Sequence, residues 1–137
     1  MECHLRPDTK INEISILGLA HIGDAVFELM ARTWLISQGS YTAKKLHKGT
    51  VALVSAKAQA AAAERITPQL SEEERAVFKR GRNAHVNSVP RGSTHEEYHA
   101  STGIEALFGH LYLSGKTERL EELFEIIVGR EDIIKCR

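Results

Sequence analysis

The stretch from Leu17 to Leu29 constrains the fold more than any other part of the chain, because it has the pattern of a helix with two different faces. Residues suited to a core recur at steps of three, four and five: Ile14, Leu19, Ile22, Val26, Leu29 and Thr33. A second row at helical spacing is polar and includes two acids: His21, Asp24, Glu28 and Arg32. The stretch therefore predicts a helix that buries one face and presents a charged row to a neighbouring surface.

Small residues interrupt the same helix at Gly18, Ala20, Gly23 and Ala25. Each glycine lowers helix stability by about 1 kcal/mol relative to alanine, so helix propensity does not explain these positions. Small side chains allow a second backbone or a bulky partner to come close. We therefore expect another element to pack tightly against this helix.

Asp24 has two interpretations. As a structural acid it is partly solvated or paired with Arg32, and structural ion pairs outnumber active-site acids. As a functional acid it needs a second acid that converges on it from another element. The spacing alone leaves both interpretations open.

The rest of the chain also favours helices, and no stretch predicts a strand convincingly. Capping residues and helix-ending pairs give the expected boundaries of the first three helices: Asn12 to about Gln38 before Gly39-Ser40, a cap at Thr42, and Ser55 to about Ile66. The later boundaries are a capping box of Ser71 with Glu74, a start at Glu96 or Glu97, an end at Ser114-Gly115, and a cap at Thr117. Trp34 is interpreted as a core anchor, with a base-stacking platform as the alternative.

The last two helices carry clear apolar stripes. Their expected core residues are Ile104, Leu107, Phe108, Leu111 and Tyr112, followed by Leu120, Leu123, Phe124, Ile127 and Val128. The fold class is therefore all-α, with six to seven helices in a single domain over residues 1–137. At 137 residues, such a domain buries a sizeable core without metals or disulfides.

Charge and cysteine usage exclude several classes of protein. Lys and Arg number 18, as do Asp and Glu, so any nucleic-acid site has to be a local patch. Cys3 and Cys136 lack zinc-ligand spacing and the first residues lack an apolar signal core, which fits a reducing, cytoplasmic setting. No window of about 18 apolar residues exists, so no membrane span is expected. The histidines form no His-Glu-x-x-His pattern, which argues against a zinc hydrolase.

A basic segment between Lys79 and Arg91 is the candidate RNA-binding patch. Its candidate contact residues are Lys79, Arg80, Arg82, Asn83, His85 and Arg91. Arginine and asparagine side chains suit phosphate and sugar edges, and a loop of this length is commonly functional or mobile. A solvated loop is the alternative. Three further cations, Lys44, Lys45 and Lys48, lie in the first turns of the second helix, where they oppose the helix dipole.

Two motifs resemble a known family. The run from Leu19 to Glu28, Leu-Ala-His-Ile-Gly-Asp-Ala-Val-Phe-Glu, resembles the first signature of the ribonuclease III endonuclease domain, specifically in its short Mini-ribonuclease III branch. The run from Tyr98 to Leu113 resembles the second signature, in the expected order and at a comparable separation. With the basic segment between them, the resemblance covers nearly the whole chain.

The resemblance implies a metal-dependent nuclease. Phosphodiester hydrolysis needs an activated water and compensation of the charge on the phosphate, and carboxylate-held Mg²⁺ supplies both. Asp24 and Glu105 are the implied catalytic and metal-binding residues, with Mg²⁺ as the cofactor and Mn²⁺ as its substitute. Two further acids of the family's metal site fall here on Ala20 and Thr102. Thr102 could hold a metal-bound water, and Glu28 is either a helper or a structural salt-bridge partner.

The resemblance also implies a substrate and partners. It implies cleavage of double-stranded RNA to 5′-phosphate and 3′-hydroxyl ends by a homodimer, on a duplex stem of precursor large-subunit ribosomal RNA. We expect no double-stranded-RNA-binding domain within residues 1–137, so specificity comes from the catalytic domain or from a partner such as a ribosomal protein. The alternative functions are a catalytically weak helical dimer that binds structured RNA or a ribosomal protein, and a scaffold with no RNA role.

Overall fold

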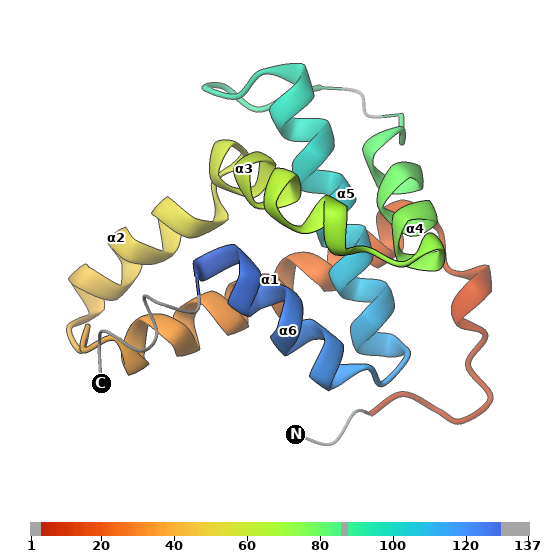
Figure 1. Cartoon of the computed structure of the whole chain (residues 1–137), viewed down its shortest axis with the longest axis horizontal. Helices are drawn as coiled ribbons and strands as arrows, with labels where there is room; N and C mark the ends of the chain where they lie inside the picture. The colour runs from red at the N-terminus through yellow and green to blue at the C-terminus, as the bar shows by residue number, and fades with distance from the viewer. Residues whose placement is uncertain (1–3, 86–87, 130–137) are drawn as a thin grey trace.

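The computed structural model, which describes residues 4–85 and 88–129 of the chain, contains six α-helices, one of which is central to the packing. The central helix is α5 (His95–Leu113), and α1, α3 and α4 pack on different sides of it (Figure 1). No strand occurs in the described ranges. The expected all-α class and the number of helices are confirmed.

The first helix, α1 (Ile16–Ser37), begins later than expected. Its cap is Ser15, whose hydroxyl accepts a hydrogen bond from the Gly18 amide at 3.0 Å. The predicted cap at Asn12 is wrong, because Asn12 lies in a separate 3-10 turn, Ile11–Glu13. The helix ends at the expected place, where Gly39 has a φ of 95° that glycine adopts without strain.

The next three helices have the expected caps. Thr42 caps α2 (Ala43–Val54) and Ser55 caps α3 (Ala56–Ile66), so a single residue separates these two helices. A 3-10 turn, Thr67–Gln69, then leads to α4 (Glu72–Arg82). Ser71 and Glu74 form the predicted capping box at its start.

Two predicted helix starts need correction. Helix α5 begins at His95 rather than at Glu96 or Glu97, because Thr94 forms a capping box with Glu97. Thr117 does not cap α6 (Thr117–Val128) but is its first residue, and the capping position is Lys116, whose side chain makes no capping bond. The predicted end of α5 is confirmed, since Ser114 follows it and Gly115 has a φ of 73°.

The core is built on α5 and α6. The predicted core residues of both helices are buried, apart from Tyr112, which is partly buried. In α1 the prediction holds for Leu19 and Val26, but Leu29 is 52% exposed and Thr33 is exposed as well. Trp34 packs against the core, as expected of an anchor. Aromatic rings join the layers, because Phe27 of α1 contacts rings of both α5 and α6.

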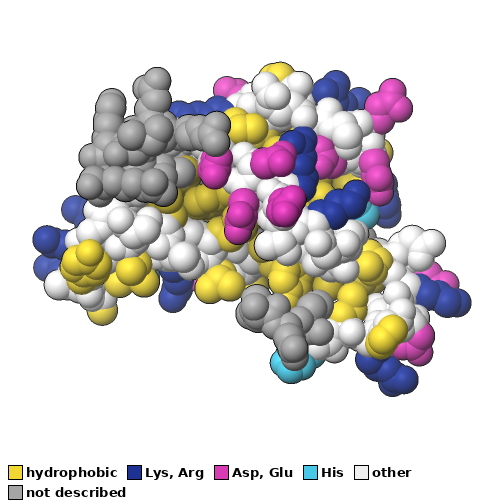
Figure 2. Space-filling model, turned by 60° about the horizontal axis from the view of Figure 1, so that its bottom comes forward, with side chains coloured by type: hydrophobic (Ala, Val, Ile, Leu, Met, Phe, Trp, Pro, Cys, Tyr) yellow, Lys and Arg dark blue, Asp and Glu magenta, His cyan; other side chains and the backbone are white. Residues whose placement is uncertain are grey.

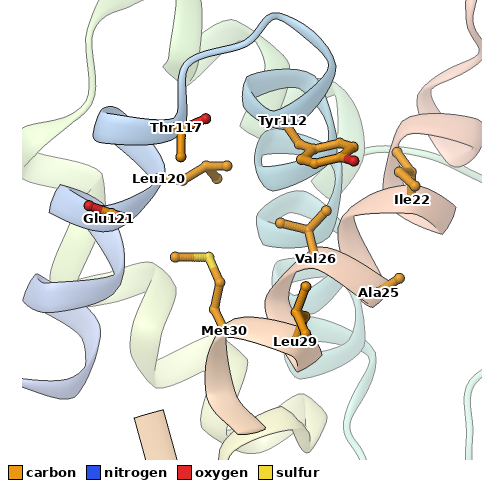
Figure 3. A pocket seen from close by; sticks show the side chains of 9 residues that line it. All are labelled: Ile22, Ala25, Val26, Leu29, Met30, Tyr112, Thr117, Leu120 and Glu121. Atoms are coloured by element: carbon orange, nitrogen blue, oxygen red, sulfur yellow. The ribbon is translucent and has the colours of Figure 1, made fainter. Parts of the chain in front are cut away.

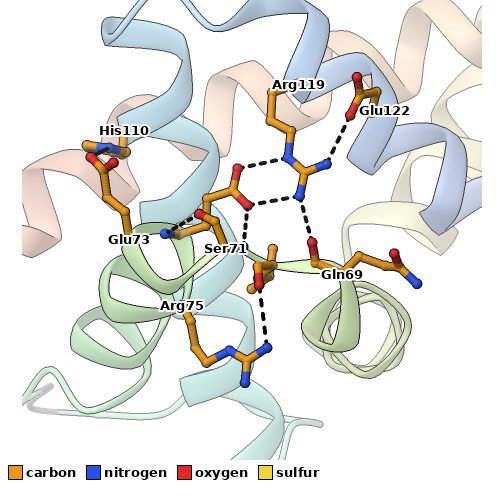
Figure 4. Close-up of polar contacts among 9 residues, drawn as sticks. Gln69, Ser71, Glu73, Arg75, His110, Arg119 and Glu122 are labelled. Atoms are coloured by element: carbon orange, nitrogen blue, oxygen red, sulfur yellow. Dashed lines mark hydrogen bonds and ion pairs between the residues drawn. The ribbon is translucent and has the colours of Figure 1, made fainter.

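A partly buried ion pair ties α4 to α6. The guanidinium of Arg119 donates to both carboxylate oxygens of Glu74, at 2.8 and 2.9 Å, and to the Gln69 carbonyl at 2.8 Å (Figure 4). It also bonds Glu122 of its own helix at 2.9 Å. These contacts lower the pKa of Glu74, chiefly through the hydrogen bond from Arg119. One arginine thus connects the turn before α4, the start of α4, and α6.

One face of the molecule combines apolar and acidic side chains. Figure 2 shows an uncovered band of hydrophobic side chains across this face, beside a group of acidic side chains. Large hydrophobic residues exposed in the described part of the chain are Leu17, Leu29, Ile36, Tyr41 and Val51. No helix among the described residues is long and apolar enough to cross a membrane.

Candidate active site

Asp24 and Glu105 meet where α1 crosses α5. The crossing is closer than side chains would allow, since a Cβ on Gly23 would lie 1.6 Å from the Glu105 carbonyl oxygen. A Cβ on Gly109 would likewise lie 2.0 Å from the Leu19 carbonyl oxygen. The predicted tight approach at the small residues of α1 is therefore confirmed. Because Gly23 and Glu105 are in backbone contact, the neighbouring Asp24 is held beside the Glu105 carboxyl group.

The carboxyl group of Glu105 has unusual electrostatics. Burial raises its pKa to about 8, with further contributions from its hydrogen bond with Asp24 and from the negative charge of Asp24. Ser101, one turn earlier on α5, donates to Glu105 Oε1 at 3.4 Å and acts in the opposite direction. Two carboxyl groups in contact cannot both ionise cheaply unless a cation joins them. In the protein alone, Glu105 therefore holds a proton at neutral pH.

Both acids line a cavity of about 490 Å³. Its walls come from α1, the junction of α2 and α3, the segment before α5, and α5 itself. The residues that line it with the two acids are Val54, Ser55, Ala56, Lys57, Gln59, Pro90, Arg91, Gly92, Ser93, Tyr98 and Ser101. Acids therefore meet cations and hydrogen-bond donors across one hollow.

The other candidate metal-site residues lie outside this cavity. Glu28 forms an ion pair with Arg32 at 3.1 Å, so Arg32 pairs with Glu28 and not with Asp24. Thr102 is buried, and its hydroxyl donates to the Tyr98 carbonyl at 3.0 Å. Ala20 packs in a small apolar cluster with Leu19, Val77 and Ala106.

The candidate RNA-binding residues are spread over several surfaces. Arg91 is the one among them that lines the cavity with the acids. The guanidinium of Arg82 lies over the Phe78 ring at 5.9 Å from its centroid, beside a second hollow between α3, α4 and α5. Arg80 lines a third hollow near His110. The remaining candidates, Lys79, Asn83 and His85, are exposed, and the basic segment also includes residues 86 and 87, which lie outside the described ranges.

Sequence reasoning missed Ser101, Gln59 and Lys57 as functional residues of the cavity. Ser101 was overlooked although it lies four residues before Glu105, the spacing at which side chains on one helix meet. Gln59 of α3 gave no signal, because nothing in the alanine-rich run around it indicates that α3 faces the acids. The pairing of α3 with α5 is visible only in three dimensions.

Comparison with known proteins gives the family. The model of the ribonuclease III domain matches residues 17–116. Mini-ribonuclease 3 of Thermoanaerobacter sp. is 47% identical over 115 residues, which are 84% of this chain and 81% of that protein. Mini-ribonuclease 3 of Clostridium tetani is 41% identical over 119 residues, 86% of this chain and 79% of that protein. The chain belongs to the Mini-ribonuclease III branch of the ribonuclease III family. The resemblance drawn from the two sequence motifs is confirmed.

The fold also matches a solved structure. The crystal structure of a protein from Fusobacterium nucleatum superimposes with a TM-score of 0.80 at 34% sequence identity, covering 88% of this chain and 98% of that one. Membership places this chain among the ribonucleases, a class of hydrolases. The two signature acids, Asp24 and Glu105, fall within the matched segment.

The acid pair of this Mini-ribonuclease III chain fits a hard divalent cation. Among the described residues, no three His, Cys, Asp or Glu side chains gather as a metal cage. Mg²⁺ does not require such a cage, because it commonly binds one or two carboxylates and completes its shell with waters and substrate phosphates. The raised pKa of Glu105 shows that the pair lacks a counter-charge in the protein alone. A divalent cation between Asp24 and Glu105 would supply that charge.

Proposed function

We propose that the chain is an endoribonuclease that hydrolyses double-stranded RNA, with Mg²⁺ held by Asp24 and Glu105 and with Mn²⁺ as an effective substitute. The observation that carries the proposal is the contact between these two carboxyl groups inside a hollow that also has basic walls. If this acid pair had only a structural role, it would lower the stability of the fold with no interaction to offset that cost. A divalent cation would explain the paired acids, and a phosphate-bearing substrate would explain the basic residues that line the same hollow.

The chain's own residues have separate tasks in this reaction. Asp24 and Glu105 bind the cation, which, when bound, acidifies a water and offsets charge on the phosphate. Ser101 orients Glu105 through its hydroxyl hydrogen bond. Lys57 and Arg91 line the same hollow and attract the phosphate backbone. The products are 5′-phosphate and 3′-hydroxyl ends.

Cleavage of duplex RNA with and without Mg²⁺ tests the proposal. Asp24→Asn and Glu105→Gln should each lower the cleavage rate at least about a hundredfold, since each removes a charged metal ligand. Glu28→Gln is the matched control, because that acid pairs with Arg32 outside the hollow, and its rate should stay within about twofold of wild type. Cleavage that persists in chelator, or in both acid variants, would disprove the metal mechanism.

A second candidate function rests on one observation. Positions 20 and 102, where the family resemblance implies acids, carry a buried alanine and a buried threonine. A helical dimer that binds structured RNA or a ribosomal protein, with weak or no catalysis, is consistent with that reduced acid set. In the cleavage experiment, it predicts duplex binding without Mg²⁺-dependent scission.

We also propose that the active form is a homodimer that acts in the cytoplasm on a duplex stem of precursor large-subunit ribosomal RNA. The branch assignment supports the substrate, and a ribosomal protein is a candidate partner in presenting it. An apolar hollow of about 310 Å³ between α1, α5 and α6 supports the dimer. Figure 3 shows Val26, Leu29 and Met30 of α1 facing it beside Tyr112 of α5 and Leu120 of α6.

A further inference from the structure

Gln59 has a buried side-chain donor, Nε2, for which the described part of the chain provides no acceptor. The residue is 2% exposed, and no atom in residues 4–85 or 88–129 accepts a hydrogen bond from this nitrogen. A buried donor without an acceptor costs about 1 to 3 kcal/mol, so such groups usually have a purpose. Gln59 also lines the hollow that contains Asp24 and Glu105. Its amide therefore borders the space where substrate would enter.

The helix that carries Gln59 presents its N-terminus to the same hollow. Ser55, Ala56 and Lys57, the cap and first two residues of α3, all line it. The first amide groups of a helix have no partner within the helix, and the Ser55 hydroxyl serves only the Ala58 amide. Gln59 lies in the next turn, where side chains lean back toward the helix start. Backbone and side-chain donors thus converge on one place.

The start of α3 is positively charged. The helix dipole adds partial positive charge at the N-terminus, and the Lys57 ammonium adds a full one at a position that the dipole disfavours. Arg91 lines the same hollow. Asp24 and Glu105 line the same hollow, but neither accepts a hydrogen bond from Gln59 Nε2. An anion, which only accepts hydrogen bonds, would complement these donors.

We propose that the start of α3 and Gln59 form a phosphate seat, which holds one phosphate of the RNA backbone beside the metal-binding acids. The Ala56 and Lys57 amides and Gln59 Nε2 donate to its oxygens, and Lys57 provides the counter-charge. This seat fixes where the RNA strand lies relative to Asp24 and Glu105. Gln59 is thus a positioning residue. The RNA part of the inference rests on the proposed function, whereas affinity of the seat for phosphate does not.

Titration of the full chain with inorganic phosphate, followed by amide NMR, tests the seat directly. Saturable shifts are expected for the Ala56 and Lys57 amides and for the side-chain amide of Gln59. Gln59→Leu keeps the volume and removes the donor, and should weaken phosphate binding about tenfold. Gln69→Leu, which changes a glutamine outside the hollow, should leave phosphate binding unchanged. Wild-type spectra without saturable shifts at these amides would overturn the proposal, as would Gln59→Leu binding phosphate like wild type.

Steady-state cleavage of duplex RNA gives the second readout. Gln59→Leu should raise KM about tenfold or more with a smaller change in kcat, because the seat holds ground and transition states alike. Thermal melting shows whether the variant is folded. A folded Gln59→Leu with wild-type KM refutes the seat and leaves the nuclease intact. Phosphate shifts at α3 in a chain that cuts no RNA refute the nuclease and leave the seat intact.

Discussion

Glu105 is a carboxyl group that the fold buries beside a second acid, although its proposed role in metal binding requires it to be ionised. It lies on the central helix, against Asp24, with a pKa of about 8. The two signature motifs were sufficient to predict this pair, because each motif presents its acid within small residues that permit a close helix crossing. Ser101 and Gln59 were not predicted, because their roles depend on which helix faces the acids. Leu29 was wrongly placed in the core. Helical periodicity identifies the residues that share one face of a helix, but it does not show how far along the helix that face stays buried.

The first prediction concerns stability against pH in chelator. Glu105 binds its proton more tightly in the folded protein than in the unfolded chain, whose value is near 4.5. The folded state is therefore favoured below pH 4.5, and that contribution is lost as the pH rises from about 4.5 through about 8. Thermal melts of the metal-free protein should show a melting temperature that falls over this range.

Two variants separate Glu105 from other groups in that experiment. Glu105→Gln, which cannot ionise, should flatten the slope between pH 5 and 8, while Glu96→Gln on the exposed side of the same helix should keep it. Mg²⁺ should raise the melting temperature of wild type most at pH 8, because it stabilises the ionised pair. An unchanged slope in Glu105→Gln would assign the pH effect to another group.

At the scale of elements, helix boundaries were predictable where a capping side chain has its partner at the right spacing. The capping box of Ser71 with Glu74 and the caps at Thr42 and Ser55 were predicted correctly. The predicted cap at Asn12 was wrong because Asn12 lies in a separate 3-10 turn before α1, and Ser15 is the cap instead. The predicted cap at Thr117 was wrong because α6 begins without a side-chain cap. The small residues around Asp24 and Glu105 predicted that these two helices meet closely, whereas the exact contact of Gly23 with the Glu105 carbonyl appears only in the structure.

Gly23→Ala tests that crossing. The added methyl would meet the Glu105 carbonyl at 1.6 Å, so α1 and α5 must separate. We expect a loss of about 3 kcal/mol or more in the free energy of unfolding, together with loss of cleavage as the acids part. Gly18→Ala on the same helix meets only side-chain atoms, at 3.0 Å, and should change stability by no more than about 1 kcal/mol. Denaturant unfolding measures both, and equal costs would contradict the close crossing.

Arg119→Met tests the link between α4 and α6. It leaves the buried Glu74 carboxylate without its main partner and should cost about 2 to 3 kcal/mol at neutral pH. The lowered pKa of Glu74 means that this stabilisation is present above the unfolded value of 4.5 and is lost as pH falls through the lower folded value. The variant and wild type should therefore converge in acid. Arg80→Met, an exposed arginine of α4, should cost less than about 0.5 kcal/mol.

At the scale of the whole molecule, an apolar hollow is open to solvent on one side of α1 and α6. Leu29 is 52% exposed at its edge, which is unusual for a leucine within a helix that is otherwise well packed. Sequence periodicity assigned this leucine to the core of a single chain. A surface covered by a second copy would explain why the pattern extends past the core.

Light scattering coupled to size-exclusion chromatography tests the homodimer. The wild-type particle should have twice the chain mass of 15.2 kDa, and Leu29→Asp should shift it toward the monomer by placing a charge in the hollow. Tyr41→Asp changes a residue that is 78% exposed outside the hollow and should leave the mass unchanged. A Leu29→Asp protein that stays dimeric would place the contact surface elsewhere.

Because α5 is packed on several sides, we expect thermal inactivation of the protein to follow the unfolding of this helix. Amide groups in a central helix exchange with solvent only when the whole domain opens, so the backbone that carries Glu105 should be among the slowest to exchange. Partial opening of outer helices would then leave Glu105 on an ordered support. Inactivation by heat should coincide with global unfolding, without an earlier loss confined to the catalytic carboxylates.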